Sequence, residues 1–169
     1  MSKTLFEAMA KRSFKGIQAA IAGGADIDAT EPEDGHTALA LMCKSKSGVM
    51  SKTETEIALW LIEHGADVMK PNDDSETPLH LVAASGNLAV LEALVAKGAK
   101  VTKTKLAYSP LHCSIDTHAK DTKLWDRLIA LGCKLEDKTK WGDTALLEAV
   151  NSHNPTAVKY FLGKGADRT

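Results

Sequence analysis

A short glycine-centred motif recurs at a nearly constant interval along the whole chain. It is found at Gly24-Ala25-Asp26-Ile27, Gly65-Ala66-Asp67-Val68, Gly98-Ala99-Lys100-Val101, Gly132-Cys133-Lys134-Leu135 and Gly165-Ala166-Asp167-Arg168. The steps between successive glycines are 41, 33, 34 and 33 residues. A fixed period of about 20 to 50 residues is the signature of a repeat architecture, so this feature decides the fold before any local preference does.

A second motif precedes each of the last four glycines and marks where a helix begins. It reads Thr37-Ala38-Leu39, Thr77-Pro78-Leu79-His80, Ser109-Pro110-Leu111-His112 and Thr144-Ala145-Leu146. Thr77 can cap a helix, and Pro78 suits the first helical position, where a backbone N–H is not needed. Gly98 stands where a helix end takes the left-handed conformation, which glycine adopts without a steric penalty.

Apolar residues recur at helical spacing in front of each closing glycine. They are Ile57, Ala58, Leu61 and Ile62; Val90, Leu91, Leu94 and Val95; Leu124, Trp125, Leu128 and Ile129; and Ala157, Val158, Phe161 and Leu162. We expect these columns to form the core. One helix pair cannot bury such a face alone, so neighbouring units must stack.

These motifs resemble those of the ankyrin-repeat family, whose unit of about 33 residues carries a T-P-L-H-x-A helix start and a Gly-Ala-Asp helix end. The resemblance covers nearly the whole chain. It implies an all-α ankyrin-repeat solenoid of about five helix-turn-helix units linked by short β-hairpin-like loops. It also implies that His80 and His112 are structural and bridge the backbone of neighbouring units through both ring nitrogens.

We expect a single ankyrin-repeat domain over residues 1–169, divided into five units. The units cover about 1–28, 29–69, 70–102, 103–136 and 137–169. The first unit lacks an opening hairpin and reads as an N-terminal cap, with Lys11, Arg12, Lys15 and Gln18 available to face water. The fifth reads as the C-terminal cap.

The second unit is longer than the others because of a polar stretch at residues 45–55. We expect this insertion to extend the turn between the two helices of that unit. It is either a tolerated surface insertion, since longer loops cost little closure entropy, or a finger that contacts a partner.

Charge and composition give no overall reason to expect a nucleic-acid or membrane partner. The formal net charge is -1, and nowhere do about 18 apolar residues follow one another. Cys43, Cys113 and Cys133 lack C-x-x-C spacing, which suits buried free thiols in a reducing compartment. We therefore expect a cytoplasmic protein.

The motifs of common catalytic and metal sites are missing from the sequence, so we expect no enzyme, no cofactor and no metal. The stretch from Asp26 to Glu31 begins like a calcium loop, but Glu31 stands where that loop needs glycine. His112 and Cys113 are adjacent on a helix and diverge by about 100°, so we expect them not to share a zinc ion.

Ankyrin partners commonly contact the hairpin tips and the exposed side of each first helix, so the resemblance predicts a partner-binding surface. The residues expected to contact a partner are Glu33, Asp34, His36, Asp73, Asp74, Glu76, Lys103, Lys105, Tyr108, Asp116, Lys138, Lys140, Trp141, Asp143 and Asn151.

This predicted surface is electrically polarised. Residues 26–36 hold five carboxylates and no Lys or Arg, whereas residues 100–110 hold three lysines and no acid. Ordinary variation on solvated loops would also account for this. As anchors we favour Trp141 and Tyr108, because aromatic residues bury much area at low entropy cost. Trp60 and Trp125 lie within second helices and read as packing residues.

We expect a protein-binding module that acts as an adaptor or scaffold and is a monomer outside its complex. The alternative is an inhibitor or an immunity-type protein that neutralises a partner enzyme or toxin by occlusion. An inhibitor should abolish its partner's activity, whereas an adaptor should bind without inactivating.

Overall fold

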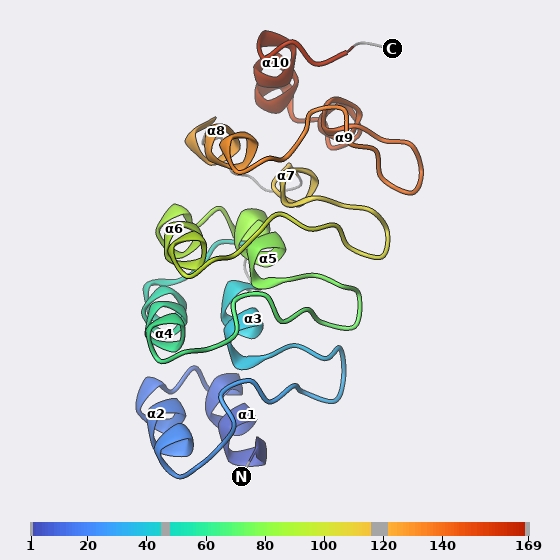
Figure 1. The fold of residues 1–169 in the computed structure, drawn as a ribbon. Helices are drawn as coiled ribbons and strands as arrows, with labels where there is room; N and C mark the ends of the chain where they lie inside the picture. Colours follow the sequence, from blue (N-terminus) through green and yellow to red (C-terminus); the bar gives the residue numbers. More distant parts are fainter. Residues whose placement is uncertain (1, 45–47, 116–121, 168–169) are drawn as a thin grey trace.

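The computed structural model describes residues 2–44, 48–115 and 122–167, which form helices arranged in five consecutive pairs (Figure 1). The pairs are α1 (Ser2–Ala10) with α2 (Phe14–Ala22), α3 (Ala38–Cys43) with α4 (Lys52–Glu63), α5 (Pro78–Ser85) with α6 (Leu88–Ala96), α7 (Pro110–Cys113) with α8 (Thr122–Ala130), and α9 (Ala145–Asn151) with α10 (Pro155–Gly163).

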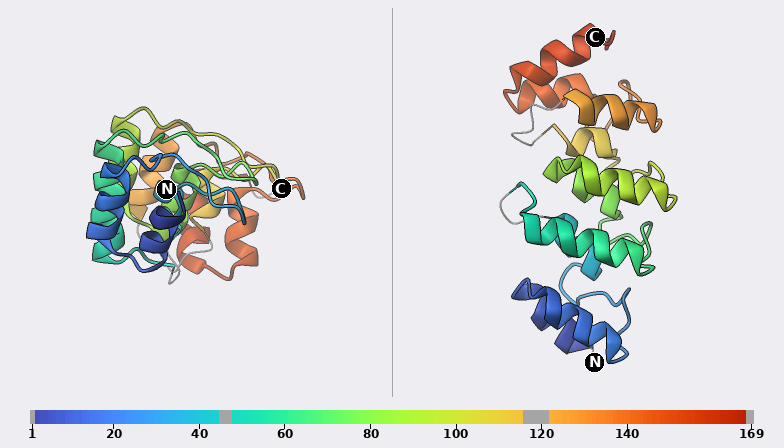
Figure 2. Two further views of the ribbon diagram at one scale, coloured as in Figure 1. Left: turned by 90° about the horizontal axis from the view of Figure 1, so that it is seen from below. Right: turned by 90° about the vertical axis from the view of Figure 1, so that its left-hand side faces the viewer.

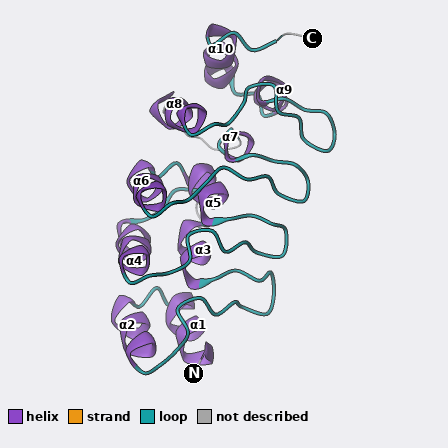
Figure 3. Cartoon of the chain, in the orientation of Figure 1, coloured by secondary structure: helices purple, strands orange, loops and turns teal. Residues whose placement is uncertain are grey.

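The pairs stack into an elongated solenoid with the two termini at opposite ends (Figure 1). The first helices pack on one another in the order α1, α3, α5, α7 and α9, and α4 packs on α6 in the second layer. The connecting hairpins project to one side of the layer of first helices (Figure 1). The right-hand view of Figure 2 is seen from the other side, where most of the second helices lie. This arrangement of helices joined by loops (Figure 3) confirms the expected all-α solenoid. Across the described residues, no helix combines the length and apolar character needed to span a membrane.

The helices begin and end as their capping residues predict. Thr37 and Thr144 accept the backbone N–H of Ala40 and Leu147 at 3.2 and 3.3 Å. Pro78 occupies the first turn of α5, behind its N-cap Thr77. Past the end of α6, Gly98 has φ +95°. Local capping chemistry therefore sets these boundaries.

The apolar columns of the second helices form the core, as predicted. Most of their side chains are buried, while Val95, Ile129, Val158 and Leu162 are half-buried against the core. Trp125 is fully buried and packs on Tyr160 and Phe161 of α10, with ring centroids 5.0 and 5.4 Å apart. Trp60 is half-buried and stacks on His64 at 3.9 Å.

Part of the insertion at residues 45–55 belongs to helix α4, so the prediction that the whole insertion extends the turn is wrong. Residues 45–47 lie outside the described residues. Ser51 is the N-cap of α4, and its hydroxyl accepts the N–H of Glu54 at 3.2 Å while Glu54 accepts the N–H of Ser51 at 2.8 Å. This reciprocal capping box adds a turn to α4. Glu54 is buried and pairs with Arg12 at 2.8 Å, so Arg12 is half-buried rather than fully exposed to water.

Each connecting loop closes as a hydrogen-bonded hairpin. The backbone N–H groups of Glu31, Asn72, Thr104 and Thr139 donate to the carbonyls of His36, Glu76, Tyr108 and Asp143, each at 2.9 Å. The second-unit hairpin is therefore one residue longer than the other three. Sheet pairing in the described part of the chain is limited to an isolated bridge between Thr30 and Thr37.

One position in each hairpin has left-handed backbone, and it predicts opposite effects for two substitutions. Ala107 has φ +61° there and Gly142 has φ +90°. Because a Cβ strains this conformation, Ala107→Gly should raise the free energy of unfolding by about 1 kcal/mol and Gly142→Ala should lower it by about the same amount. A Cβ on Gly142 would meet no atom within 4 Å, so only backbone strain is tested. Urea denaturation followed by circular dichroism measures both; equal signs would contradict the argument.

Candidate functional site

Backbone hydrogen bonds tie each hairpin tip to the next. The N–H of Asp73 donates to Asp34 O at 3.0 Å, that of Lys105 to Asp74 O at 3.0 Å, and that of Lys140 to Leu106 O at 2.9 Å. We call the residues at these junctions the tip row: Glu33, Asp34, Asp73, Asp74, Lys105, Leu106, Lys140 and Trp141. These hydrogen bonds align the hairpin tips along one edge of the solenoid, which is on the right of Figure 1.

The charges of the tip row are sorted along the stack. The second and third units contribute four exposed carboxylates, from Glu33, Asp34, Asp73 and Asp74. The fourth and fifth units contribute two exposed lysines, Lys105 and Lys140, together with two exposed apolar side chains, Leu106 and Trp141. Asp34, Asp74, Leu106 and Trp141 hold equivalent places in successive hairpins, so the change of character falls between the third and fourth units.

Tyr108 lies beside Trp141, the last residue of the tip row. Their ring centroids are 6.0 Å apart with an interplanar angle of 69°, and Tyr108 also lies edge-on to His112 at 5.9 Å. Trp141 is 62% exposed, whereas Tyr108 is half-buried. Tyr108 thus supports an indole that faces solvent. Edge-to-face aromatic pairs of this kind are favourable beyond the area they bury.

The other predicted contact residues differ in how well they can reach a partner. Lys138 and Asn151 are exposed, whereas Glu76 and Asp143 are half-buried. Lys103 is exposed but pairs with Asp137 at 2.8 Å. The prediction for Asp116 lies outside the described residues.

His36 is buried, with 1% of its surface exposed, so its predicted place on the contact surface is wrong. Asn72 Oδ1 accepts the N–H groups of Asp74 and Glu76 at 3.0 and 2.8 Å, which directs Asn72 Nδ2 towards His36 Nε2 at 3.0 Å. In this network Nε2 is the acceptor, so the proton of neutral His36 is on Nδ1, 3.3 Å from Glu31 Oε1. The ring therefore joins the second hairpin to the third.

Glu31, Asp34 and His36 also offer ligand atoms within 4.8 Å of one another. A metal ion would need the lone pair of His36 Nδ1, which the Asn72 contact leaves protonated. Lys44 Nζ is already 3.6 Å from Asp34 Oδ2. Glu31 is thus hydrogen-bonded to the His36 ring and to the backbone N–H of Asp34, while the Asp34 carboxylate faces Lys44.

His80 and His112 each use both ring nitrogens to tie the start of a helix to the loop that closes its unit, which agrees with the structural role that the resemblance implied. By the expected unit bounds, His112 reaches the next unit, whereas Thr102 is the last residue of the unit that holds His80. His80 Nδ1 accepts the N–H of Thr77 at 3.1 Å, and Nε2 lies 3.1 Å from Thr102 O. His112 makes the same contacts with Ser109 N at 3.3 Å and Asp137 O at 3.1 Å. Burial lowers the pKa of both imidazoles. Hydrogen bonds to backbone carbonyls raise the pKa, but their effect is smaller than that of burial.

These histidines predict a loss of stability in mild acid. Their pKa is lower in the folded than in the unfolded chain, so the unfolded chain binds protons more readily. Stability should be full above about pH 6.5 and fall below it, by at most about 1.4 kcal/mol per pH unit for each histidine. Urea denaturation between pH 7.5 and 5 measures this, and His80→Gln with His112→Gln should flatten the curve. Equal wild-type stability at both ends of the range would contradict it.

The cysteines give no catalytic nucleophile. Burial raises the pKa of Cys43 and of Cys113 to about 12, and that of Cys133 to about 11. All three therefore remain thiols at neutral pH, and the thiol is a far weaker nucleophile than the thiolate. They behave as small apolar side chains.

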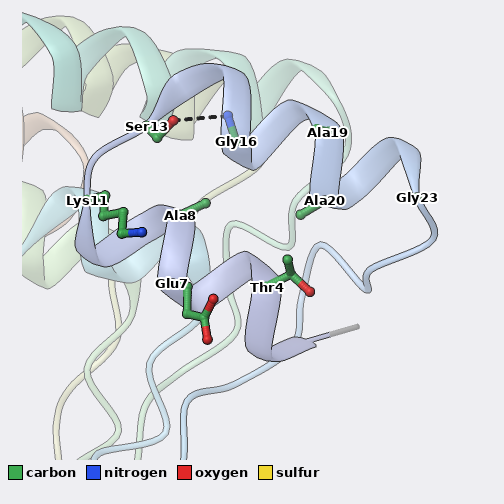
Figure 4. A pocket seen from close by; sticks show the side chains of 9 residues that line it. All are labelled: Thr4, Glu7, Ala8, Lys11, Ser13, Gly16, Ala19, Ala20 and Gly23. Carbon is green, nitrogen blue, oxygen red and sulfur yellow. Dashed lines mark hydrogen bonds between the residues drawn. The ribbon is translucent and has the colours of Figure 1, made fainter.

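A shallow groove of about 510 Å³ lies between α1 and α2 at the N-terminal end of the stack (Figure 4). Gly16 and Ala20 stand where the third unit has Val90 and Leu94, so small side chains leave the space open. A Cβ on Gly16 would come within 3.0 Å of Ala8 Cβ and of Ser13 Oγ. The glycine therefore allows the two helices to approach closely at this point.

Comparisons with known proteins agree with this geometry. Residues 5–105 match the family model described as ankyrin repeats in three copies. An ankyrin repeat and KH domain-containing protein from Caenorhabditis briggsae is 35% identical over 104 residues, which is 60% of this chain and 4% of that protein. The chain thus spans a small part of that relative, and the helix pairs continue beyond the matched region through α10. The chain belongs to the ankyrin-repeat family.

Proposed function

We propose that this chain binds another protein through the tip row, with Trp141 and Tyr108 as the anchor, and acts as an adaptor or scaffold. Ankyrin repeats are generally protein–protein interaction modules and are typically non-enzymatic. The observation that carries the proposal is the 62% exposed indole of Trp141, held against Tyr108 at a hairpin tip where core packing does not require it. Aromatic side chains of this kind are enriched among interface hot spots.

The charges of the tip row support a partner of matching polarity. Opposite Glu33, Asp34, Asp73 and Asp74 the partner would present basic groups. Opposite Trp141 and its neighbouring lysines it would present an apolar surface flanked by acidic groups. Complementary charges of this kind orient the two proteins and speed their association more than they add affinity.

Affinity capture from lysate of the native source, at moderate salt, tests the proposal. The wild type is compared with the Tyr108→Ala, Trp141→Ala double variant and with Val150→Ala, a control that truncates another exposed apolar residue, 52% exposed on α9. Circular dichroism checks that each variant is folded. A protein retained by the wild type and the control but lost by the double variant is the expected result. Equal retention by all three contradicts it.

The captured protein then separates an adaptor from an inhibitor. Its own activity is measured with and without a saturating amount of this chain. Unchanged activity identifies an adaptor, whereas abolished activity identifies an inhibitor or immunity-type protein. Either result leaves the tip row as the binding surface.

A further inference from the structure

A cavity of about 660 Å³ lies between α1 and the second-unit hairpin, at the acidic end of the tip row. Its volume falls in the range of about 300–1,000 Å³ that is usual for ligand pockets. α1 contributes Phe6 and Met9, and α3 contributes Leu41 and Met42. Met9 and Met42 are buried, whereas Phe6 and Leu41 are half-buried and keep part of their apolar surface towards solvent. The cavity therefore has an apolar floor.

Carboxylates line the hairpin side of this cavity. They belong to Glu31, Glu33 and Asp34. Glu31 is held in place, because its Oε1 accepts the N–H of Asp34 at 3.2 Å and lies 3.3 Å from His36 Nδ1. Its side chain is 14% exposed. A carboxylate fixed in this way loses little entropy when it binds a cation.

The two cationic side chains that line the cavity are already paired. Arg12 Nε lies 2.8 Å from Glu54 Oε1, and Lys44 Nζ lies 3.6 Å from Asp34 Oδ2. Within the described residues, Glu33 has no ion-pair partner, and Glu31 contacts the His36 ring rather than a lysine or an arginine. Glu31 and Glu33 therefore leave the cavity with an excess of negative charge.

The geometry points to an occupant that is apolar along its length and cationic at its tip, namely the side chain of an arginine from the bound protein. Its aliphatic stem fits the floor formed by Met9, Leu41 and Met42, as long basic side chains cover apolar surface while their charge stays in a polar setting. The planar guanidinium suits carboxylates and aromatic faces, which Glu31, Glu33 and Phe6 supply. This inference rests on the proposed function, because it names one group of the same partner.

A pair of peptides tests the cavity without knowledge of the partner. The probes are acetyl-Gly-Ala-Arg-Ala-Gly-amide and the same peptide with citrulline, which is close in shape and uncharged. Each is titrated into the uniformly ¹⁵N-labelled chain and followed by NMR. We expect the arginine peptide to shift the amide signals of residues 31, 33–36 and 41–44 with a Kd on the order of 1 mM, and the citrulline peptide to bind at least about tenfold more weakly. Raising the salt concentration should weaken the arginine peptide.

Matched substitutions assign the effect to the carboxylates. Glu33→Gln changes an exposed side chain and should weaken the arginine peptide by about threefold or more, and Glu31→Gln with Glu33→Gln by about tenfold or more. Glu63→Gln removes the same charge from an exposed position on α4 and should have no effect. Equal binding of the two peptides, no shift at about 20 mM arginine peptide, or full binding by the double variant would overturn the inference.

The captured partner separates this inference from the proposed function. A protein that is lost by the Tyr108→Ala, Trp141→Ala variant but binds the Glu31→Gln, Glu33→Gln variant with wild-type affinity would keep the tip row as the docking surface and remove the arginine pocket. A protein weakened by both variants would support both.

Discussion

Trp125→Ala should lower the free energy of unfolding by about 3–5 kcal/mol, the range usual for removing a large buried aromatic side chain. The indole is fully buried on α8 and contacts Tyr160 and Phe161 of α10, so it joins the fourth unit to the fifth. In a stacked repeat, stability is a sum of unit and interface terms, and loss of one interface term releases the end of the stack. We expect α8, α9 and α10 to unfold first in this variant.

Trp125→Phe is the matched control for this prediction. Among the described residues, the indole N–H has no hydrogen-bond partner. Phenylalanine keeps most of the apolar volume and removes this unsatisfied donor, so the change should cost less than about 1.5 kcal/mol. Urea denaturation followed by circular dichroism measures both variants. An equal loss of stability in the two would contradict the prediction, because it would show that the apolar volume kept by phenylalanine does not hold the interface together.

The Tyr108→Ala, Trp141→Ala double variant should weaken binding of the captured protein by about 2–4 kcal/mol, which is about 30- to 1,000-fold in Kd. Trp141 supplies the exposed indole, and Tyr108 fixes its direction through the edge-to-face contact. Leu106, exposed at the equivalent place in the fourth hairpin, extends the same apolar area. A rim charge such as Lys140 should matter less, because an exposed ion pair contributes about 0–1 kcal/mol.

Stability measurements keep this effect separate from misfolding. Trp141 is mostly exposed, so its truncation should change the free energy of unfolding by less than about 0.5 kcal/mol. Tyr108 is half-buried and its truncation should cost somewhat more. The Tyr108→Ala and Trp141→Ala changes should therefore leave the chain folded at 25 °C, with the helical circular dichroism of the wild type.

Much of the fold could be predicted because its boundaries depend on local chemistry. Each boundary depends on residues that are close together in the sequence. Helix α5 begins at Thr77 and Pro78, and the chain turns away from α6 at Gly98, which has left-handed backbone. The apolar columns repeat at helical spacing in every unit, so the buried side of each second helix followed from the sequence. The exposed tips and their sorted charges followed from the same register.

The sequence predictions were wrong where a side chain is held by a residue far away in the sequence, and where a local capping motif was not taken into account. His36 is buried, and its Nε2 contacts Asn72 in the next hairpin. No sequence pattern near residue 36 predicts this contact. The Ser51–Glu54 capping box could have been read from its spacing, and it places part of the supposed turn in α4. The arginine cavity was missed because it needs Phe6 and Leu41 from different units to lie on either side of one space.

The central claim, that a partner protein docks on the tip row through Trp141, is tested most directly by isothermal titration calorimetry of the captured protein with the wild type, Trp141→Ala and Val150→Ala. We expect Trp141→Ala to raise Kd by about 10-fold or more and Val150→Ala to leave it within about twofold of the wild type. A Kd for Trp141→Ala within about twofold of the wild type would contradict the account and place the interface elsewhere on the solenoid.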